Sequence, residues 1–224
     1  MKLTPLLVIL ACSTLPGAAQ PGANEQPPNV LLIAIDDLND WVGCLSAPER
    51  TGGGGHPDAR TPHIDRLAGR GVLFTNAHCQ APICNPSRTS IMYGLRPSTS
   101  GIYLNSPKPW TVPALKGRVT MPRHFAANGY LTLTTGKIYH GSGLPPGDFE
   151  VVGPRPGQRI KPDKRLVADL KGLWDFGAQD YDEELMQDHA DATWAINEIG
   201  KQHDRPFFLA IGFYRPHVPF YSPA

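Results

Sequence analysis

Two neighbouring carboxylates, Asp36 and Asp37, directly follow an unbroken apolar run at 29–35 (NVLLIAI). Paired carboxylate oxygens are the hard ligands that Ca²⁺ and Mg²⁺ prefer in proteins. The same pair could instead open a loop, with one Asp accepting a hydrogen bond within a turn. The pair therefore predicts either a divalent cation site or a turn at the end of a strand.

A cysteine begins the second segment whose residues could take part in chemistry, Cys84-Asn85-Pro86-Ser87-Arg88. Proline suits the first turn of a helix, which places Cys84 at a helix N-terminus with Arg88 one turn further on. A helix N-terminus and a nearby positive charge both favour a reactive thiolate. The alternative is a small buried cysteine that only packs beside the helix.

Three further polar residues, Lys137, His140 and His217, each come shortly after a predicted strand. Sites in open α/β sheets form beyond the carboxyl ends of strands, and helix N-termini attract anions. These residues can therefore converge with the Asp pair and Cys84 on one pocket for a negatively charged ligand. Taken singly, each has a plainer interpretation: a solvated lysine, a loop histidine, and a histidine that packs a turn between two prolines.

The elements that would position these residues alternate between strand and helix. Strands are predicted at 29–35, 72–74, 130–135 and 206–213, and the continuous apolar run of the first suits burial on both faces of the sheet. Helices are predicted at 61–71, 86–95, 120–129 and 182–199, the last with an apolar face formed by Leu185, Ala192, Ile196 and Ile199. Residues 141–179 are expected to be irregular. The alternation indicates an α/β fold with a mainly parallel sheet.

Composition sets limits on the class of protein. The chain has 224 residues, enough for one large domain or two small ones, and with 41% hydrophobic and 18% charged residues it can bury a core. Its formal charge of +1 excludes a nucleic-acid binder that works through bulk charge. The 24 prolines and 23 glycines predict many loops.

The N-terminus has the features of an export signal. A positive start, an apolar run at 6–11 and small residues after it predict a signal peptide over 1–19. Alternatively, Cys12 lies in a segment that resembles a bacterial lipobox and would carry a lipid anchor. Both alternatives predict an exported protein, periplasmic or secreted, with 20–28 as a Pro-rich tether. No apolar run is long enough for a transmembrane span.

Export also bears on the cysteines. Once Cys12 is removed or lipidated, Cys44, Cys79 and Cys84 remain. Three is an odd number, so at most one internal disulfide forms and one cysteine needs another explanation.

The segment that begins at Cys84 resembles the signature of the type I, formylglycine-dependent sulfatases. It reads CNPSR at 84–88, followed by TSIMYGLRP at 89–97. Four other segments are similar to the same family, and most similar to its iduronate-2-sulfatase group: 28–44, 61–79, 134–140 and 206–220. The resemblance covers nearly all of 28–224 and is weakest across 141–180. One departure is His63, where the family more often has Asn.

The resemblance implies a fold and an activity. The fold would be an alkaline-phosphatase-like α/β sandwich, of which 29–224 form the N-terminal part, incomplete at the C-terminus. The activity would be sulfuric ester hydrolysis on a sulfated carbohydrate. A formylglycine-generating enzyme or an anaerobic maturase would oxidise Cys84 to formylglycine. One hydroxyl of its hydrate would attack sulfur, and the second would let sulfate leave as the aldehyde re-forms.

The resemblance also implies a role for each candidate residue. Asp36, Asp37 and residue 84 would hold Ca²⁺, or Mg²⁺ in its place. Arg88 would hold the hydrate, and Lys137 would bind sulfate oxygens as a compact cation. The two histidines would move protons: His140 would assist the elimination, and His217 would contact the sulfate and protonate the leaving oxygen.

Further metal ligands and a second sulfate-binding lysine come from a later segment in this family. We therefore expect residues 1–224 alone to bind metal poorly and to have little activity. One alternative is a phosphodiesterase or phosphonate hydrolase of the same superfamily, since kinship of fold does not decide the substrate. Another is a non-enzymatic relative that binds sulfated glycans and keeps an unmodified Cys84.

Overall fold

The computed structural model describes residues 26–46, 55–56, 58–141, 143–154, 166–167 and 174–224. The predicted signal peptide with Cys12 and residues 20–25 of the predicted tether lie outside this range. Within the described part, no helix is both long enough and apolar enough to cross a membrane.

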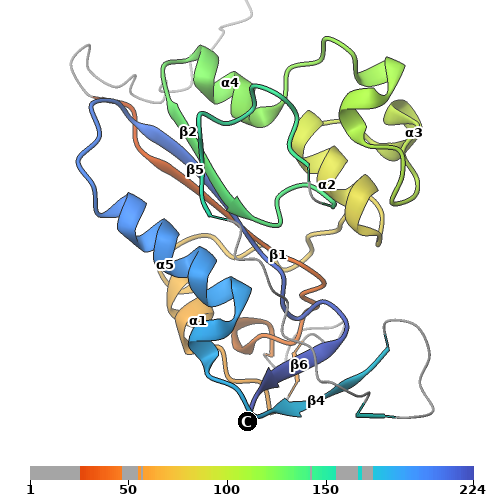
Figure 1. Ribbon diagram of the computed structural model, residues 1–224, viewed down its shortest axis with the longest axis vertical. Helices are drawn as coiled ribbons and strands as arrows, with labels where there is room; N and C mark the ends of the chain where they lie inside the picture. The colour runs from red at the N-terminus through yellow and green to blue at the C-terminus, as the bar shows by residue number, and fades with distance from the viewer. Residues whose placement is uncertain (1–25, 47–54, 57, 142, 155–165, 168–173) are drawn as a thin grey trace, which may run out of the picture.

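The main sheet is parallel and carries the site at one edge. Its strand order is β1 (Val30–Ile35), β5 (Phe207–Phe213), β2 (Leu131–Gly136) and β3 (Val151–Val152), with parallel pairing throughout. Because β1, β5 and β2 run side by side in one direction, their carboxyl ends meet at the same edge (Figure 1). The α/β prediction is confirmed, and these three strands lie within two residues of the predicted bounds.

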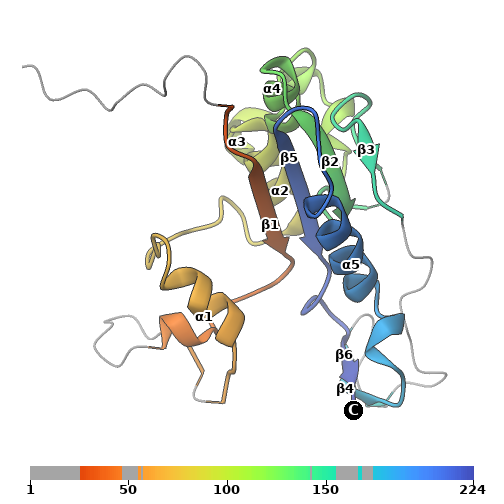
Figure 2. The same cartoon turned by 90° about the vertical axis from the view of Figure 1, so that its left-hand side faces the viewer.

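Helices cover both faces of this sheet. On one face, α2 (Cys84–Tyr93) and α4 (Met121–Ala127) enclose a core that includes Met92, Tyr139 and Phe208. On the other face, α5 (Gln187–Ile199) packs on β5 and β2 (Figure 2). The smaller helices are α1 (Pro62–Ala68) and α3 (Pro97–Ser100), with 3-10 turns at Gly43–Leu45, Pro109–Thr111, Pro113–Leu115 and Glu183–Leu185.

The prediction that the first strand is buried on both faces is wrong. Leu32 and Ala34 pack against the α2 side, but Leu31 and Ile33 on the opposite side are each 45% exposed. The reason is position in the sheet. β5 lies between β1 and β2 and is buried on both faces, whereas β1 is last in the strand order and α5 lies over its neighbours.

The predicted helix at 182–199 is also partly wrong. The 3-10 turn Glu183–Leu185 ends at Met186, whose backbone is extended, and α5 begins only at Gln187. The helix buries Asp191, Ala195 and Glu198, while Ile196 is 68% exposed. The side of α5 that faces the sheet therefore contains Ala195 and Asp191, whose carboxylate accepts a hydrogen bond from Thr135 in β2. The predicted apolar face does not pack on the sheet.

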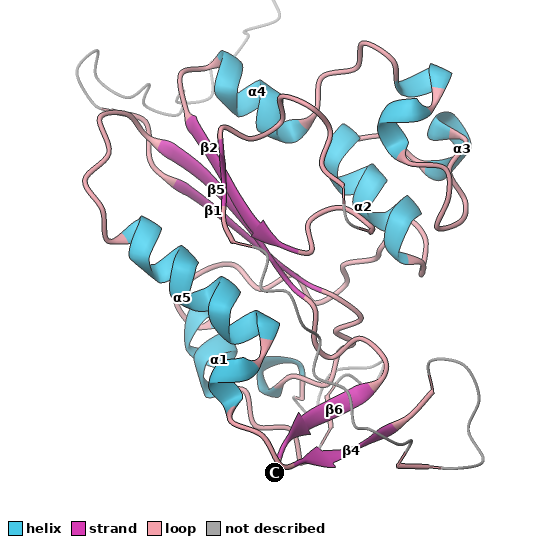
Figure 3. Ribbon diagram, in the orientation of Figure 1, coloured by secondary structure: helices cyan, strands magenta, loops and turns pink. Residues whose placement is uncertain are grey.

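Other segments differ from the sequence-based expectation. Residues 72–74 form no strand, and Val72 and Phe74 are exposed. A second, two-stranded parallel sheet pairs β4 (Phe176–Gln179) with β6 (Phe220–Pro223) near the end of the chain (Figure 3). β3 and β4 both fall in the stretch that was expected to be irregular.

Candidate active site

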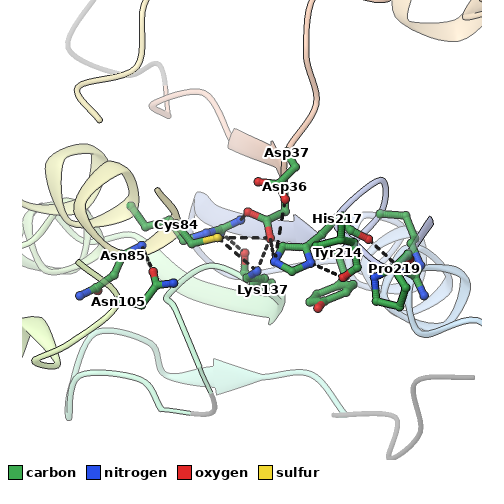
Figure 4. Close-up of polar contacts among 12 residues, drawn as sticks. Asp36, Asp37, Cys84, Asn85, Asn105, Lys137, Tyr214, His217 and Pro219 are labelled. Atoms are coloured by element: carbon green, nitrogen blue, oxygen red, sulfur yellow. Dashed lines mark hydrogen bonds and ion pairs between the residues drawn. The ribbon is translucent and has the colours of Figure 1, made fainter. Parts of the chain in front are cut away.

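Six of the seven candidate residues lie together at the carboxyl edge of the main sheet. Asp36 and Asp37 follow β1, Lys137 follows β2, and His217 lies in the turn after β5. Cys84 and Arg88 come from the first turns of α2, which lies over the same edge. The structure therefore brings these six side chains together, and all of them except Arg88 are labelled in Figure 4.

Glycine at the end of β2 is needed to place Lys137. Gly136 has φ +71°, and a side chain there would meet the carbonyl oxygen of Gly212 on β5 at 2.1 Å. The backbone N–H of Lys137 donates to that same carbonyl at 2.7 Å. The two strands thus stay paired up to the residue that enters the site.

Asp36 is the electrostatic centre of the site and is 5% exposed. Its Oδ1 accepts a hydrogen bond from Arg88 Nη2 at 2.7 Å, and its Oδ2 accepts one from Lys137 Nζ. Burial alone would raise the pKa of this carboxyl, but the two cations outweigh it and hold the pKa below its ordinary value. Asp36 is therefore ionised.

Arg88 holds more than one group in place. Its Nη1 donates to the carbonyl oxygens of Lys137 and, at 3.2 Å, of Ile138. Because its side chain is only 8% exposed, these partners satisfy most of its donors away from water. Arg88 thus joins β1, α2 and the segment after β2.

The Cys84 thiol lies against this charged group. Its Sγ is 3.7 Å from Lys137 Nζ and 3.9 Å from Asp36 Oδ2. Burial raises the pKa of the thiol, and Lys137 offsets this only in part because Asp36 and Asp37 act in the same direction as burial. An unmodified Cys84 is accordingly not the activated thiolate that its helix position suggested.

His217 approaches from the opposite side. Its Nδ1 lies 2.6 Å from the carbonyl oxygen of Val218, and since a carbonyl only accepts, Nδ1 carries the proton. The other nitrogen, Nε2, lies 3.9 Å from Asp36 Oδ2 and 3.8 Å from Asp37 Oδ2. His217 therefore presents Nε2 to the carboxylate pair.

Among the described residues, His140 makes no hydrogen bond or ion pair to the other six candidates, although the charges of Lys137 and Asp36 act on its ring. Its Nδ1 is buried and makes no hydrogen bond among the described residues. Burial lowers its pKa, and the nearby Lys137 charge lowers it further. The ring is thus neutral at pH 7 and has a free nitrogen.

Sequence reasoning missed Tyr214 as part of the site. Its ring lies 4.7 Å from Lys137 Nζ, in cation–π geometry, and 4.6 Å from the His217 ring. It also missed Asn85, which is 2% exposed and donates from Nδ2 to the carbonyl oxygens of Leu104 and Pro107, both at 3.0 Å. Tyr214 is the first residue after a buried strand, and that position was the available signal.

The donor set fits a divalent cation. Single ligand atoms of Asp36, Cys84 and His217 lie within 4.8 Å of one another, and an Asp37 oxygen lies beside His217. Two carboxylates provide the hard oxygens that Ca²⁺ and Mg²⁺ require. Asp37 is suited to this role because its side chain is 47% exposed. Among the described residues, its nearest ion-pair partner is His217, at 3.8 Å.

A cavity of about 640 Å³ opens between β1 and α2, and four of the site residues line it. Asp36, Asp37, Cys84 and Arg88 line its polar end, and Ile33, Ile35 and Ile91 line its apolar part. A small anionic group could enter at the polar end.

Comparison with known protein families decides the family. The model of the Sulfatase family matches residues 28–224. The chain belongs to the sulfatase family.

Individual sulfatases agree with this assignment. A sulfatase of Formosa agariphila is 41% identical over 213 residues, covering 88% of this chain and 40% of that protein. The iduronate 2-sulfatase of Homo sapiens is 33% identical over 236 residues, covering 97% of this chain and 40% of that protein. The chain thus spans about two fifths of the length of these two relatives.

Solved structures support the fold alone. The phosphonate monoester hydrolase of Agrobacterium radiobacter aligns with a TM-score of 0.62 at 23% identity, over 88% of this chain and 42% of that one. A 2-O GAG sulfatase aligns with a TM-score of 0.54 at 22% identity, over 85% of this chain and 35% of that one. The alkaline-phosphatase-like α/β architecture expected from the sequence is therefore confirmed.

Proposed function

We propose that this sulfatase-family protein removes sulfate from a sulfated carbohydrate, with residue 84 in its formylglycine form as the nucleophile. The observation that carries the proposal is the position of Cys84 Sγ, 3.7 Å from Lys137 Nζ and beside the buried Asp36. A nucleophile is thereby placed next to the cation that an incoming sulfate group would need. Formylglycine supplies, as its hydrate, a hydroxyl for attack on sulfur and a second hydroxyl for release of sulfate.

The divalent cation would be held by Asp36 and Asp37 with residue 84, and we propose Ca²⁺, with Mg²⁺ as the alternative. Its contribution would be Lewis-acid stabilisation of developing negative charge. Lys137 would bind sulfate oxygens as a point charge, its ammonium held between Asp36 and the Tyr214 ring. Arg88 would act on the nucleophile indirectly, by holding the Asp36 carboxylate in place beside residue 84.

The two histidines would divide the proton transfers. His217 Nε2 faces the site because Nδ1–H is committed to the Val218 carbonyl, so the imidazolium form of His217 would protonate the leaving alcohol oxygen from Nε2. His140 has a lowered pKa and a free Nδ1, which suits a neutral base that takes a proton as sulfate is eliminated. Their different surroundings favour this assignment over the reverse one.

The substrate class is proposed from similarity. Identity of 33% to human iduronate 2-sulfatase across 97% of this chain favours a 2-O-sulfated uronic acid within a glycan. We further propose that the protein is exported, either with 1–19 cleaved or with Cys12 lipidated, and that a formylglycine-generating enzyme or an anaerobic maturase modifies Cys84.

The decisive experiment is mass spectrometry of the tryptic peptide 71–88 after co-expression with a formylglycine-generating enzyme. This peptide contains both Cys79 and Cys84, so Cys79 is an internal control. We expect an aldehyde, trapped by a hydrazide, at residue 84 and an intact thiol at 79. An intact thiol at 84, with a modified reference sulfatase from the same cells, would overturn the proposed nucleophile and favour a glycan-binding role.

Turnover then separates sulfatase from phosphoesterase activity. We expect matched aryl esters to be hydrolysed in the order sulfate over phosphate or phosphonate. The structural similarity to a phosphonate monoester hydrolase is below 25% identity and concerns the fold, so a reversed order would assign that chemistry instead.

A further inference from the structure

The first turn of α5 contacts the backbone that leads into the site. Both carboxylate oxygens of Asp188 accept backbone hydrogen bonds beyond the end of β5: Oδ1 from Tyr214 N at 2.7 Å and Oδ2 from Arg215 N at 2.8 Å. Hydrogen bonds to a carboxylate are among the stronger ones in proteins. One side chain therefore fixes two consecutive peptide groups.

These two peptide groups begin the turn that carries His217. The segment YRPHVPF has few backbone donors, because Pro216 and Pro219 lack an N–H. His217 N donates to the Tyr214 carbonyl oxygen at 3.0 Å, and Arg215 Nη1 donates to the His217 carbonyl oxygen at 2.7 Å. Hydrogen bonds within the turn thus stabilise it, and Asp188 joins the turn to α5.

The orientation of the imidazole depends on that turn. Its Nδ1 bonds the next carbonyl along the same segment, so the ring direction follows the backbone and aims Nε2 at Asp36 and Asp37. A shift of the turn by 1 Å would move Nε2 by a similar amount. Misplacement on this scale can cost about 10²-fold in rate.

We propose that Asp188 is a positioning residue for His217, acting through the Tyr214 and Arg215 peptide groups. The proposal rests on the proposed function for its catalytic consequence, but not for its structural one. Asp191, one turn further along α5, makes a similar contact to a different strand end: it accepts from Thr135 Oγ1 at 2.6 Å, two residues before Lys137. The first turns of α5 thereby contact the ends of two strands, through Asp188 after β5 and Asp191 in β2.

The structural test uses ¹⁵N-labelled histidine and the variants Asp188→Ala and Asp188→Asn. In the parent we expect the His217 ring signals of a single Nδ1-protonated state. In Asp188→Ala we expect these signals to shift and the Tyr214 and Arg215 amides to exchange about 10-fold to 10²-fold faster, since a charged acceptor is lost. Asp188→Asn keeps one acceptor oxygen and should give an intermediate result.

Internal controls separate positioning from general loosening. The ring signals of His203 and His124, which lie away from the site, should stay in place. Asp182→Ala is the matched control, because Asp182 is exposed and its side chain makes no cap hydrogen bond to the turn that follows. Unchanged His217 signals in Asp188→Ala would overturn the proposal, and so would a shift of all histidines together.

The catalytic test is a double-mutant cycle with an aryl sulfate and the formylglycine form. We expect Asp188→Ala to lower kcat about 10²-fold with a smaller change in KM, and to have no further effect in a His217→Ala background. Additive losses would show that Asp188 acts elsewhere. The histidine signals decide the positioning role even if residues 1–224 show little turnover, as is expected of this part of the domain alone.

Discussion

At the scale of single residues, the two neighbouring carboxylates have different surroundings. Asp36 is buried, and each of its oxygens accepts from a different cation, whereas the Asp37 side chain is 47% exposed. Removal of a buried partner leaves uncompensated charge, and removal of an exposed one does not. The pair should therefore share a role in cation binding without sharing one in stability.

We predict that Asp36→Ala lowers the free energy of unfolding by about 3–5 kcal/mol, because Arg88 and Lys137 lose their common partner. Asp37→Ala should change it by less than about 1 kcal/mol. Urea titrations measure both, and calorimetric titration with Ca²⁺ should show weakened binding in both variants. Equal destabilisation by the two substitutions would contradict the assignment of Asp36 as the electrostatic centre of the site.

Cys84 should be a slow thiol despite its place at the start of α2. Its raised pKa leaves little thiolate near pH 8, and only the thiolate reacts with iodoacetamide. We predict slower alkylation of unmodified Cys84 than of the exposed Cys79, with a pH midpoint above that of an ordinary thiol. Peptide mass spectrometry against time and pH gives both rates. Faster reaction at Cys84 would mean that Lys137 outweighs burial.

At the scale of elements, strand ends were the predictable part. The strands β1, β2 and β5 and the polar residues after them could be predicted from the sequence, since parallel strands bring their carboxyl ends together. Which helix face packs inward could not. The apolar pattern of α5 favoured Ile196, but the structure buries Ala195 for close approach and Asp191 for its bond to Thr135. A contact between a carboxylate and a strand end leaves no periodic signal.

The sheet edge and the short strands were missed for a related reason. Exposure of Leu31 and Ile33 depends on which strand lies last in the order, and residues 30–35 look the same in either position. β4 and β6 are four residues each and pair across more than 40 positions of sequence. Such non-local pairing is set by the fold as a whole and not by local pattern.

The buried carboxylate of α5 gives a pH-dependent prediction. Burial raises the pKa of Asp191 above 3.8, its ordinary value, so the folded state holds this proton more tightly than the unfolded state. Its contribution to stability is therefore present at acid pH and declines as pH rises through the folded-state pKa. Relative to the parent, Asp191→Asn should gain stability as pH rises from about 4 to 7. Urea unfolding across this range checks the trend, with the exposed Asp182→Asn as the matched control.

At the scale of the whole molecule, the site is close to charge balance. Asp36 and Asp37 carry two negative charges against the two positive charges of Arg88 and Lys137. The chain as a whole is similarly balanced at +1, so long-range attraction contributes little to anion binding. A sulfate group entering this balanced site would add net negative charge beside two carboxylates. A divalent cation would add two positive charges and offset that negative charge.

We therefore predict that inorganic sulfate and Ca²⁺ bind cooperatively. Each ligand should stabilise the fold, and at 100 times its dissociation constant a ligand adds about 2.7 kcal/mol. Because coupling is reciprocal, Ca²⁺ should tighten sulfate binding by the factor by which sulfate tightens Ca²⁺ binding. Thermal unfolding with each ligand alone and with both measures this coupling. Asp37→Ala should abolish it with little change in the unliganded midpoint, whereas Lys137→Met should weaken sulfate binding most. Independent, additive shifts would show that the cation and the anion do not share this site.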